Sequence, residues 1–364
     1  MNKSLTLLFL IFCCGLPGLL NAQVFINGSK AHIVTQGRAT IRVNHLDFVN
    51  DGEFNQKQGD FILHNANRET YLEGRNTPNF ANFKLDIEGV LLVNSDLVVR
   101  QEFHLKKGEV DLQNSNLILP LNESRLAGET VNKRVLSSGS GEIVKHFVKE
   151  PIYNQNIGNL GLIFTQFENT DSLTIRRGHS SLPIPFGESI TRYYKVNTRK
   201  RPRDKIELEL EYFEDEVVTK DPNLVENIWV MNNGKWDRTE ANTTHNPRPS
   251  GLGVKANLEI YESTITVGLY RRLIDWSSVP NSFTPNNDGI NDTFVIPGIE
   301  KLPNAEVRVY NVYGQLLYKS KNYKKEPWDG TSEGSVLPIG VYIYQVIDTT
   351  NPLEFVELEV SIIK

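Results

Sequence analysis

The chain has 364 residues, with 39 Lys and Arg against 44 Asp and Glu, so its formal net charge of −5 is small and of mixed sign. Such a balance does not favour nucleic-acid binding, which needs concentrated positive charge. Both cysteines, Cys13 and Cys14, precede residue 20. The remainder therefore has no disulfide, no Cys-ligated zinc site and no Cys nucleophile. The length predicts two or three domains.

Residues 1–22 have the features of a secretory signal peptide. Lys3 supplies the positive start, residues 5–20 are almost continuously apolar, and Ala22 offers a small residue for cleavage. The uninterrupted apolar part ends at Cys14, which is too short for a membrane-spanning helix of about 20 residues. We expect cleavage after Sec export and a mature chain that is not integral to a membrane.

Residues 23–135 have very short apolar runs separated by turns rich in Asn and Gly. Runs of three to five residues recur every six to eight residues, for example at 90–93, 97–99 and 103–105. Strands this short suit a chain that turns repeatedly and stacks rung on rung. We predict a β-helix-like short-strand region of about five rungs. The alternative is a meander of short hairpins.

Residues 136–276 contain longer strands. Residues 206–212 alternate strictly, with one apolar face and one face carrying Glu207, Glu209 and Glu211. We predict a β-sandwich region in which these glutamates form a solvated face. Its other predicted strands lie at 173–176, 193–196, 228–231 and 265–269, and residues 239–253 are predicted to be a long loop.

Residues 277–281 are predicted to be a linker, and residues 282–364 a compact unit. About seven alternating runs fit into this last unit, and the final one continues to residue 362. That density predicts an immunoglobulin-like β-sandwich. The fold class of the whole chain is therefore all-β.

Four ordered blocks of the last unit resemble the gliding-motility-associated C-terminal domain, which is the type B sorting domain of the Bacteroidota type IX secretion system. The blocks lie at 282–292, 310–315, 328–330 and 338–344, and Val312-Tyr313 stand where the family more often has Arg-Trp. The residues that carry the resemblance are Phe283, Thr284, Pro285, Asn286, Asp288, Gly289, Asn291, Asp292, Gly314, Trp328, Asp329, Gly330, Pro338, Gly340 and Tyr342.

This resemblance implies export across the outer membrane by the type IX translocon, after Sec export to the periplasm. Attachment to the cell surface or release into the medium would follow. The implied partners are the translocon and its outer-membrane shuttle and attachment components. The resemblance covers less than a quarter of the chain and does not specify the role of residues 23–276.

Two more segments of the sequence are candidate ligand sites. Asn286, Asp288, Asn291 and Asp292 place four oxygen-bearing side chains within seven residues, which suits calcium. The alternative is a network of Asx turns in which these side chains bond their own backbone. A tentative anion patch for surface glycan or lipopolysaccharide consists of Arg199, Lys200, Arg201, Arg203 and Lys205; the alternative is an ordinary loop tip.

The two earlier regions carry a weaker resemblance to secreted Bacteroidota surface proteins. Residues 90–119 resemble their β-helix-like segments. Residues 158–162, 177–179 and 192–194 resemble the sandwich that often follows them.

No catalytic motif is present in the sequence: the seven histidines include no pair at i and i+4, and there is no phosphate-binding loop. We therefore expect a non-enzymatic secreted or cell-surface protein, serving adhesion or structural display, without a cofactor unless calcium binds. The alternative is a polysaccharide-acting enzyme, a β-helix lyase or a glycosidase, carried by the same tail.

Overall fold

The computed structural model describes residues 24–66, 69–148, 151–167, 172–184, 187–202, 204–219, 224–239, 252–271, 273–348 and 355–363. The predicted signal peptide lies outside these ranges. The described residues are all-β, as predicted, and form two compact units, the second of which consists mainly of Arg271–Lys364. No helix in these ranges is long and apolar enough to cross a membrane. The short 3-10 helices are η1 (Ile157–Asn159), η2 (Glu214–Glu216), η3 (Trp276–Ser278) and η4 (Ile299–Lys301).

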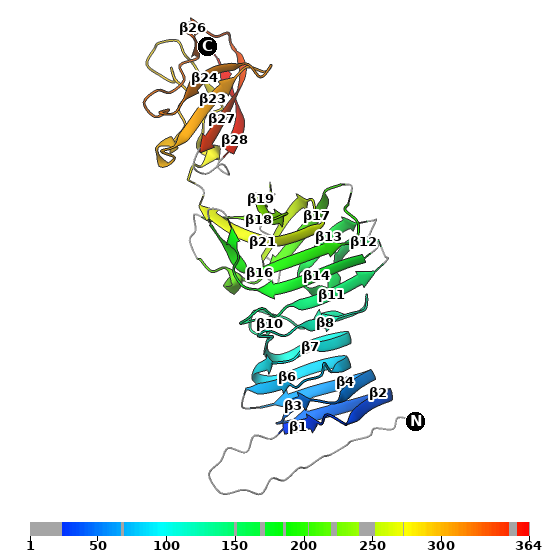
Figure 1. Cartoon of the computed structure of the whole chain (residues 1–364). Coiled ribbons are helices and arrows are strands. Elements are labelled where there is room, and N and C mark those ends of the chain that lie inside the picture. Colours follow the sequence, from blue (N-terminus) through cyan, green and yellow to red (C-terminus); the bar gives the residue numbers. More distant parts are fainter. Residues whose placement is uncertain are drawn as a thin grey trace, which may run out of the picture. The chain divides into compact units, whose positions relative to one another are not determined.

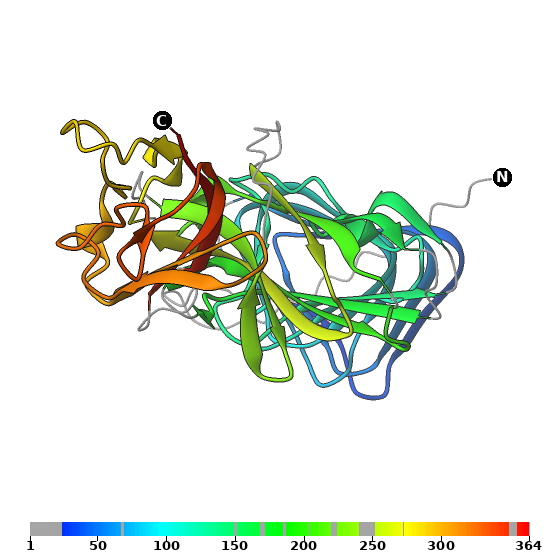
Figure 2. The same cartoon turned by 90° about the horizontal axis from the view of Figure 1, so that it is seen from above.

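The first unit begins as a parallel β-helix with three faces (Figures 1 and 2). Each rung pairs in parallel register with the rung above it, so that the blue and cyan rungs lie over one another in Figure 2. The strands of this part are β1 (Val24–Asn27), β2 (His32–Asn44), β3 (Asp47–Asn50), β4 (Glu53–Asn65), β5 (Thr70–Glu73), β6 (Asn79–Val93), β7 (Leu97–Asp111), β8 (Leu117–Leu119), β9 (Arg125–Ala127) and β10 (Val135–Leu136).

The prediction of uniformly short strands is wrong for β2 and β4, which have 13 residues each, and for β6 and β7, which have 15 each. Lys107 and Gly108 form a corner inside β7, because the chain bends there without leaving the ladder. Gly108 makes the corner possible. Its φ is +85°, and a Cβ would lie 2.8 Å from the Gly89 carbonyl oxygen of the rung below.

Aromatic stacking fills the interior of the β-helix. Phe61, Phe83 and Phe103 occupy the same position on successive rungs and are fully buried. The Phe83 and Phe103 rings are parallel to within 4°, with centroids 4.9 Å apart, and the Phe61 ring lies 5.3 Å from that of Phe83. Because each ring contacts the next, the core continues along the stack.

Buried asparagines stabilise one corner of the stack. Asn27 Nδ2 donates to Asn50 Oδ1 at 2.7 Å, and Asn50 Nδ2 donates to the Asn76 carbonyl oxygen at 2.8 Å. Asn27 and Asn50 are 23 residues apart, one rung of the helix. These amides supply polar partners where the chain turns between faces.

The β-helix continues directly into a β-sandwich. β8 pairs in parallel with β11 (Ile143–Val148), which pairs antiparallel with β14 (Ser172–His179), so one sheet extends through both parts. Its further strands are β15 (Pro183–Ile184), β16 (Gly187–Thr198), β18 (Leu224–Asn232), β19 (Lys235–Arg238) and β21 (Glu262–Arg271). The opposing sheet consists of β12 (Ile152–Asn156), β13 (Leu162–Phe167), β17 (Ile206–Tyr212) and β20 (Leu252–Leu258).

One hydrophobic core runs through the β-helix and the sandwich. It includes Phe103 and Leu126 at the top of the helix, and Phe164, Leu208 and Ile265 between the two sheets. The expected boundary at residue 135 is thus a change of strand architecture within one compact unit. The predicted strand at 206–212 is β17, with its apolar residues buried and its three glutamates on the outer side. Most of the predicted loop at 239–253 lies outside the described residues.

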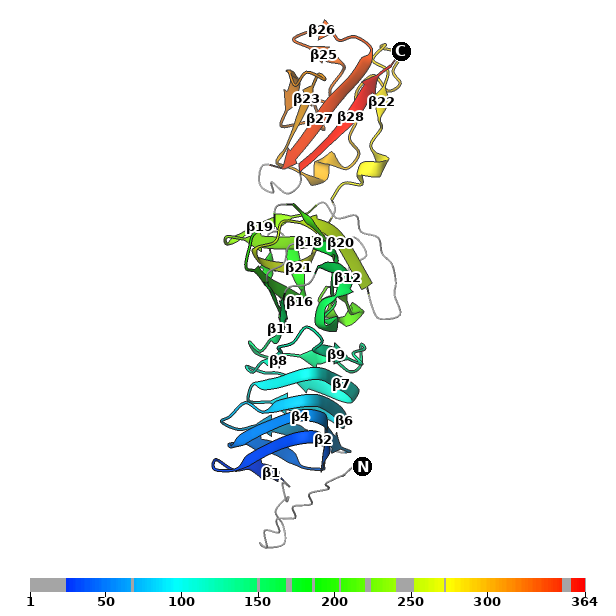
Figure 3. The ribbon, with the colours of Figure 1, turned by 90° about the vertical axis from the view of Figure 1, so that its right-hand side faces the viewer.

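The second unit contains a five-stranded sheet in the order β22-β28-β27-β23-β24 and a β25–β26 hairpin (Figure 3). Trp276 and Val279 pack against its core, so the expected linker at 277–281 lies within this unit. The strands are β22 (Ser282–Phe283), β23 (Ala305–Tyr310), β24 (Leu316–Ser320), β25 (Thr331–Ser332), β26 (Ser335–Val336), β27 (Gly340–Asp348) and β28 (Phe355–Ile362).

Candidate functional site

The first recognised block forms a tight loop held by its own carboxylates. Asp292 Oδ1 accepts from the backbone N–H groups of Asn286 and Asn287, at 3.1 and 2.6 Å, and Oδ2 accepts from Gly289 at 2.8 Å. Asp288 Oδ1 accepts from the N–H of Ile290 at 2.8 Å, and Asn286 Oδ1 from that of Asp288 at 3.0 Å. This is the Asx-turn arrangement that the sequence left as the alternative. Calcium binding stays a prediction.

The second block forms the turn between β23 and β24. Asn311 Oδ1 accepts from the backbone N–H groups of Tyr313 and Gln315, each at 3.0 Å. Asn311 Nδ2 donates to Gln315 Oε1 at 3.1 Å, and Gly314 has a φ of +81°. The Asn, Gly and Gln of this block therefore fix the turn.

The third and fourth blocks build the core of the second unit. Trp328 is fully buried, and its indole N–H donates to the Thr331 carbonyl oxygen at 3.0 Å. Its ring lies 5.3 Å from each of Phe283 and Tyr342, centroid to centroid. The Tyr342 hydroxyl donates to the Pro338 carbonyl oxygen at 2.7 Å. These contacts assign structural roles to Phe283, Trp328, Pro338 and Tyr342.

The basic cluster occupies the turn between β16 and β17. Arg199, Lys200, Arg201 and Lys205 are exposed, and Arg203 lies outside the described residues. Arg201 forms an ion pair with Glu259 at 3.1 Å, and the Lys200 carbonyl oxygen accepts from the Thr198 hydroxyl at 2.9 Å. The turn presents positive charge to solvent, and the anion patch stays a prediction.

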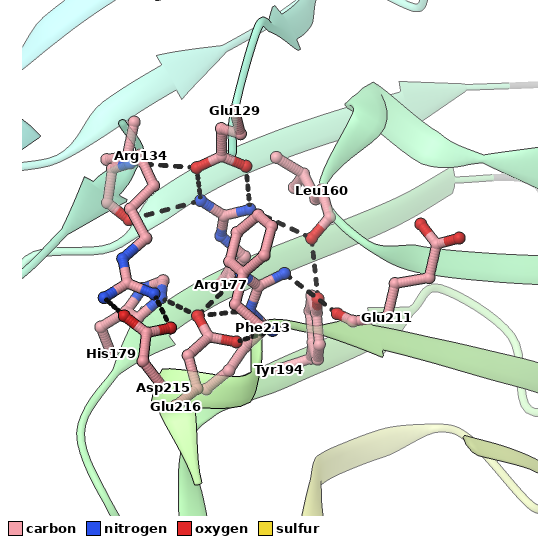
Figure 4. Close-up of polar contacts among 12 residues, drawn as sticks. Glu129, Arg134, Leu160, Arg177, His179, Tyr194, Glu211, Phe213, Asp215 and Glu216 are labelled. Carbon is pink, nitrogen blue, oxygen red and sulfur yellow. Dashed lines mark hydrogen bonds and ion pairs between the residues drawn. The ribbon is translucent and has the colours of Figure 1, made fainter. Parts of the chain in front are cut away.

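A buried charge network joins the β-helix to the sandwich (Figure 4). The sequence did not predict this network. Glu129, between β9 and β10, forms a two-bond ion pair with Arg177 of β14, with N–O distances of 2.6 and 2.8 Å. Glu216 of η2 accepts from Arg192 of β16 at 2.7 Å and from His179 of β14 at 2.8 Å. The bonds from arginine to carboxylate are charge-assisted and shielded from solvent, which makes them strong and directional.

The network also includes backbone groups and a third ion pair. The Leu160 carbonyl oxygen accepts from Arg177 at 3.2 Å and from the Tyr194 hydroxyl at 2.7 Å. Arg134 pairs with Asp215 through two bonds of 2.5 Å. Three segments that resemble the sandwich of secreted Bacteroidota surface proteins thus converge here, at residues 158–162, 177–179 and 192–194. Their acidic partners carry no motif that would have identified them.

The ionisation of this network follows from its burial. Loss of solvent lowers the pKa of His179 to about 4, so the ring is neutral at pH 7 and donates Nε2–H to Glu216. Burial alone would raise the pKa of the Glu216 carboxyl, but the Arg192 charge and the His179 hydrogen bond hold that pKa well below its usual range. Glu216 is therefore a permanent anion rather than an acid or base poised near neutral pH.

Two cavities border the network: an open one of about 390 Å³, whose lining includes Arg134, His179 and Asp215, and a small one. The small one has a volume of about 70 Å³ and is lined by Glu129, Arg192, Phe213 and neighbouring residues. Ligand pockets usually have about 300–1,000 Å³. A larger, open depression of about 430 Å³ lies on the β-helix face, and a second of about 530 Å³ shares Glu123 and Arg125 with it. The lining of the first is polar: Asp60, Asn82, Lys84, Gln101, Glu102, Glu123 and Arg125.

Comparison with protein families matches residues 277–354 to the CHU_C type IX secretion signal domain. The match confirms the resemblance of the C-terminal blocks. The second unit is therefore a type IX secretion signal domain, which directs the chain to the cell surface or the extracellular space. No match was found among curated proteins or among solved structures.

Proposed function

We propose that the first unit is a non-enzymatic cargo, displayed at the cell surface or released, that serves adhesion or structural display. The observation that carries the proposal is that the buried charged groups bind one another. Glu129 pairs with Arg177 across the junction of β-helix and sandwich, and Glu216 pairs with Arg192 within the sandwich. Strongly shifted groups often mark active sites, but structural ion-pair networks shift pKa values too.

The shape of the proposed adhesive surface also supports this function. The polar depressions that share Glu123 and Arg125 lie open on the first unit. Their hydrogen-bonding side chains suit a hydroxyl-rich ligand such as a surface glycan, held by several weak contacts. Lys84 pairs with Asp60 and Arg125 with Glu102, so most of the lining charge is balanced. We therefore expect preference for neutral rather than strongly anionic glycans.

The first experiment tests where the protein goes. Cells producing the full chain, or the chain without Arg271–Lys364, are fractionated into periplasm, surface and medium. Because Trp276 and Val279 pack against the core of the second unit, the deletion starts before them, at residue 271. The truncated protein should accumulate in the periplasm. Its appearance in the medium would contradict export through this tail.

The second experiment tests what the first unit does. Purified protein comprising residues 23–364 is applied to a glycan array and, separately, incubated with the polysaccharides it binds. Gln101→Ala/Glu123→Ala should weaken binding at least tenfold. The matched control Glu88→Ala removes an exposed carboxylate that pairs with Lys107 outside the depression. Release of shortened or unsaturated sugars would instead support the enzyme alternative.

A further inference from the structure

The turn at 311–315 of the secretion signal domain is rigid. The Asn311 side chain accepts two backbone N–H groups and donates to Gln315, and the Asn311 N–H donates to the Gln315 carbonyl oxygen at 3.1 Å. Gly314 N–H closes the turn on the Asn311 carbonyl oxygen at 2.9 Å. A turn fixed in this way holds its two remaining side chains in place before any partner arrives.

Those two side chains, Val312 and Tyr313, extend into solvent. Tyr313 is 91% exposed and Val312 is 60% exposed. Phe283, Trp328 and Tyr342 of the other recognised blocks are buried in the core, whereas Ile290 and Ile339 of those blocks are 67% and 57% exposed. Within the described part of the second unit, Val312 and Tyr313 thus have no packing role that explains them.

The sheet extends this exposed apolar surface. Tyr310 pairs with Ile343 and with Leu316, and its side chain lies on the face of the sheet turned away from the core. A bulge in the β23–β24 ladder places Leu317 and Tyr318 against the core and returns Leu316 to the outer face. Val341, two residues before Ile343, faces the same side. We call this set the turn patch: Tyr310, Val312, Tyr313, Leu316, Val341 and Ile343.

Polar side chains border the turn patch on this face. Glu306 forms ion pairs with Arg308 and Lys319, at 2.5 and 3.0 Å, and Gln345 donates to Glu357. The turn patch is therefore an apolar area bordered by balanced charge, which is the composition of a protein-recognition surface. Tyrosine is well suited to the centre of such a surface, because it buries a large rigid area at low entropic cost.

We propose that a protein component of the type IX export machinery recognises this signal domain by binding the turn patch, with Tyr313 as the central anchor. A secretion signal must be recognised through its surface, and the four recognised blocks differ in what they leave for recognition. The 282–292 and 338–344 blocks also expose apolar side chains, such as Ile290 and Ile339, but the 310–315 block presents an adjacent apolar pair on a fixed turn, and Tyr313 is 91% exposed. The partner should offer an apolar pocket that accepts an aromatic ring. This inference rests on export through the tail.

The test uses the full chain in its native cells. Val312→Ser/Tyr313→Ser should reduce the surface and medium fractions at least tenfold, with accumulation in the periplasm. The matched control is Val295→Ser/Val336→Ser, which removes two side chains of 53% and 77% exposure that lie in the same unit but outside the four recognised blocks. Export of the control should be unchanged. Tyr313→Trp should retain export, because it keeps an aromatic anchor.

Three further measurements decide between explanations. Equal export of the patch variant and the unaltered chain would overturn the proposal, and tail deletion in the same cells would show whether type IX export itself still holds. A lower denaturant midpoint for unfolding of the purified variant than of the unaltered chain would mean that the patch packs within the chain. A change from dimer to monomer in light scattering would identify a second copy as the occupant. Either result would also overturn the proposal.

Discussion

The two units of this chain place their apolar and charged groups in opposite ways. In the first unit, the aromatic rings lie in a continuous interior and a network of charges is buried at the junction with the sandwich. In the second, a compact core around Trp328 is combined with an exposed apolar patch at one turn. The first unit therefore uses these groups in internal contacts, whereas the second presents apolar side chains at its surface. The following predictions test that contrast, beginning with the largest effect.

Removing one ring from the stack should break the first unit alone. Phe83→Ala should cost about 4 kcal/mol of unfolding free energy, because it deletes a fully buried ring between Phe61 and Phe103 and leaves a cavity. Urea unfolding followed by proteolysis should show a destabilised first unit and an unchanged second unit. Phe83→Leu is the milder control. Equal destabilisation of both units would contradict their separate cores.

Removing one charge from the junction should cost nearly as much. Glu129→Gln leaves the fully buried Arg177 without its carboxylate, and such a loss costs about 3 kcal/mol. The double variant Glu129→Leu/Arg177→Met removes both charges, and it should be more stable than Glu129→Gln. Chemical denaturation measures both. A double variant less stable than the single one would mean that the ion pair itself supplies the stability.

The pH dependence of the first unit should report His179. Its folded pKa of about 4 lies below the value of 6.5 for an unfolded chain, so the unfolded state takes up the proton first as pH falls. The free energy of unfolding should therefore be unaffected by this residue above pH 6.5 and decrease between pH 6.5 and 4, by at most about 3 kcal/mol. His179→Gln should flatten that slope in denaturation series. An unchanged slope would assign it to other groups.

A carboxylate on the outer face of the sandwich should matter least. Glu207 bonds to Thr165 at 2.8 Å and pairs with Lys255, which lowers the pKa of its carboxyl, but it is exposed to solvent. Glu207→Gln should change stability by less than about 0.5 kcal/mol, since surface pairs contribute little. Thermal unfolding is a sufficient measurement. A larger loss would mean that the buried network is not the main electrostatic feature of the unit.

Much of this architecture could be predicted from local sequence patterns. The alternation at 206–212 predicted β17 because a period of two needs only neighbouring residues. The short apolar runs at 90–119 predicted a stacked β-helix, but they did not predict strands as long as β6 and β7. A corner at Gly108 has the same local signature whether the ladder stops or bends there.

The junction network could not be predicted, for a different reason. Glu129 and Arg177 are 48 residues apart, and Arg192 and Glu216 are 24 apart. Their pairing depends on how the last rung meets the sandwich, which no local pattern encodes. The secretion signal domain was easier to predict from the sequence, because its blocks follow one another within a single small unit.

The rung-to-rung register of the β-helix has a consequence for how such proteins diversify. Each rung contacts only the rungs beside it, and the turn from Asn27 to Asn50 takes 23 residues. Duplication of one such stretch would extend the body by one inter-strand spacing of about 4.8 Å and leave both the junction and the secretion signal untouched. Length can therefore vary by whole turns without redesign of either end.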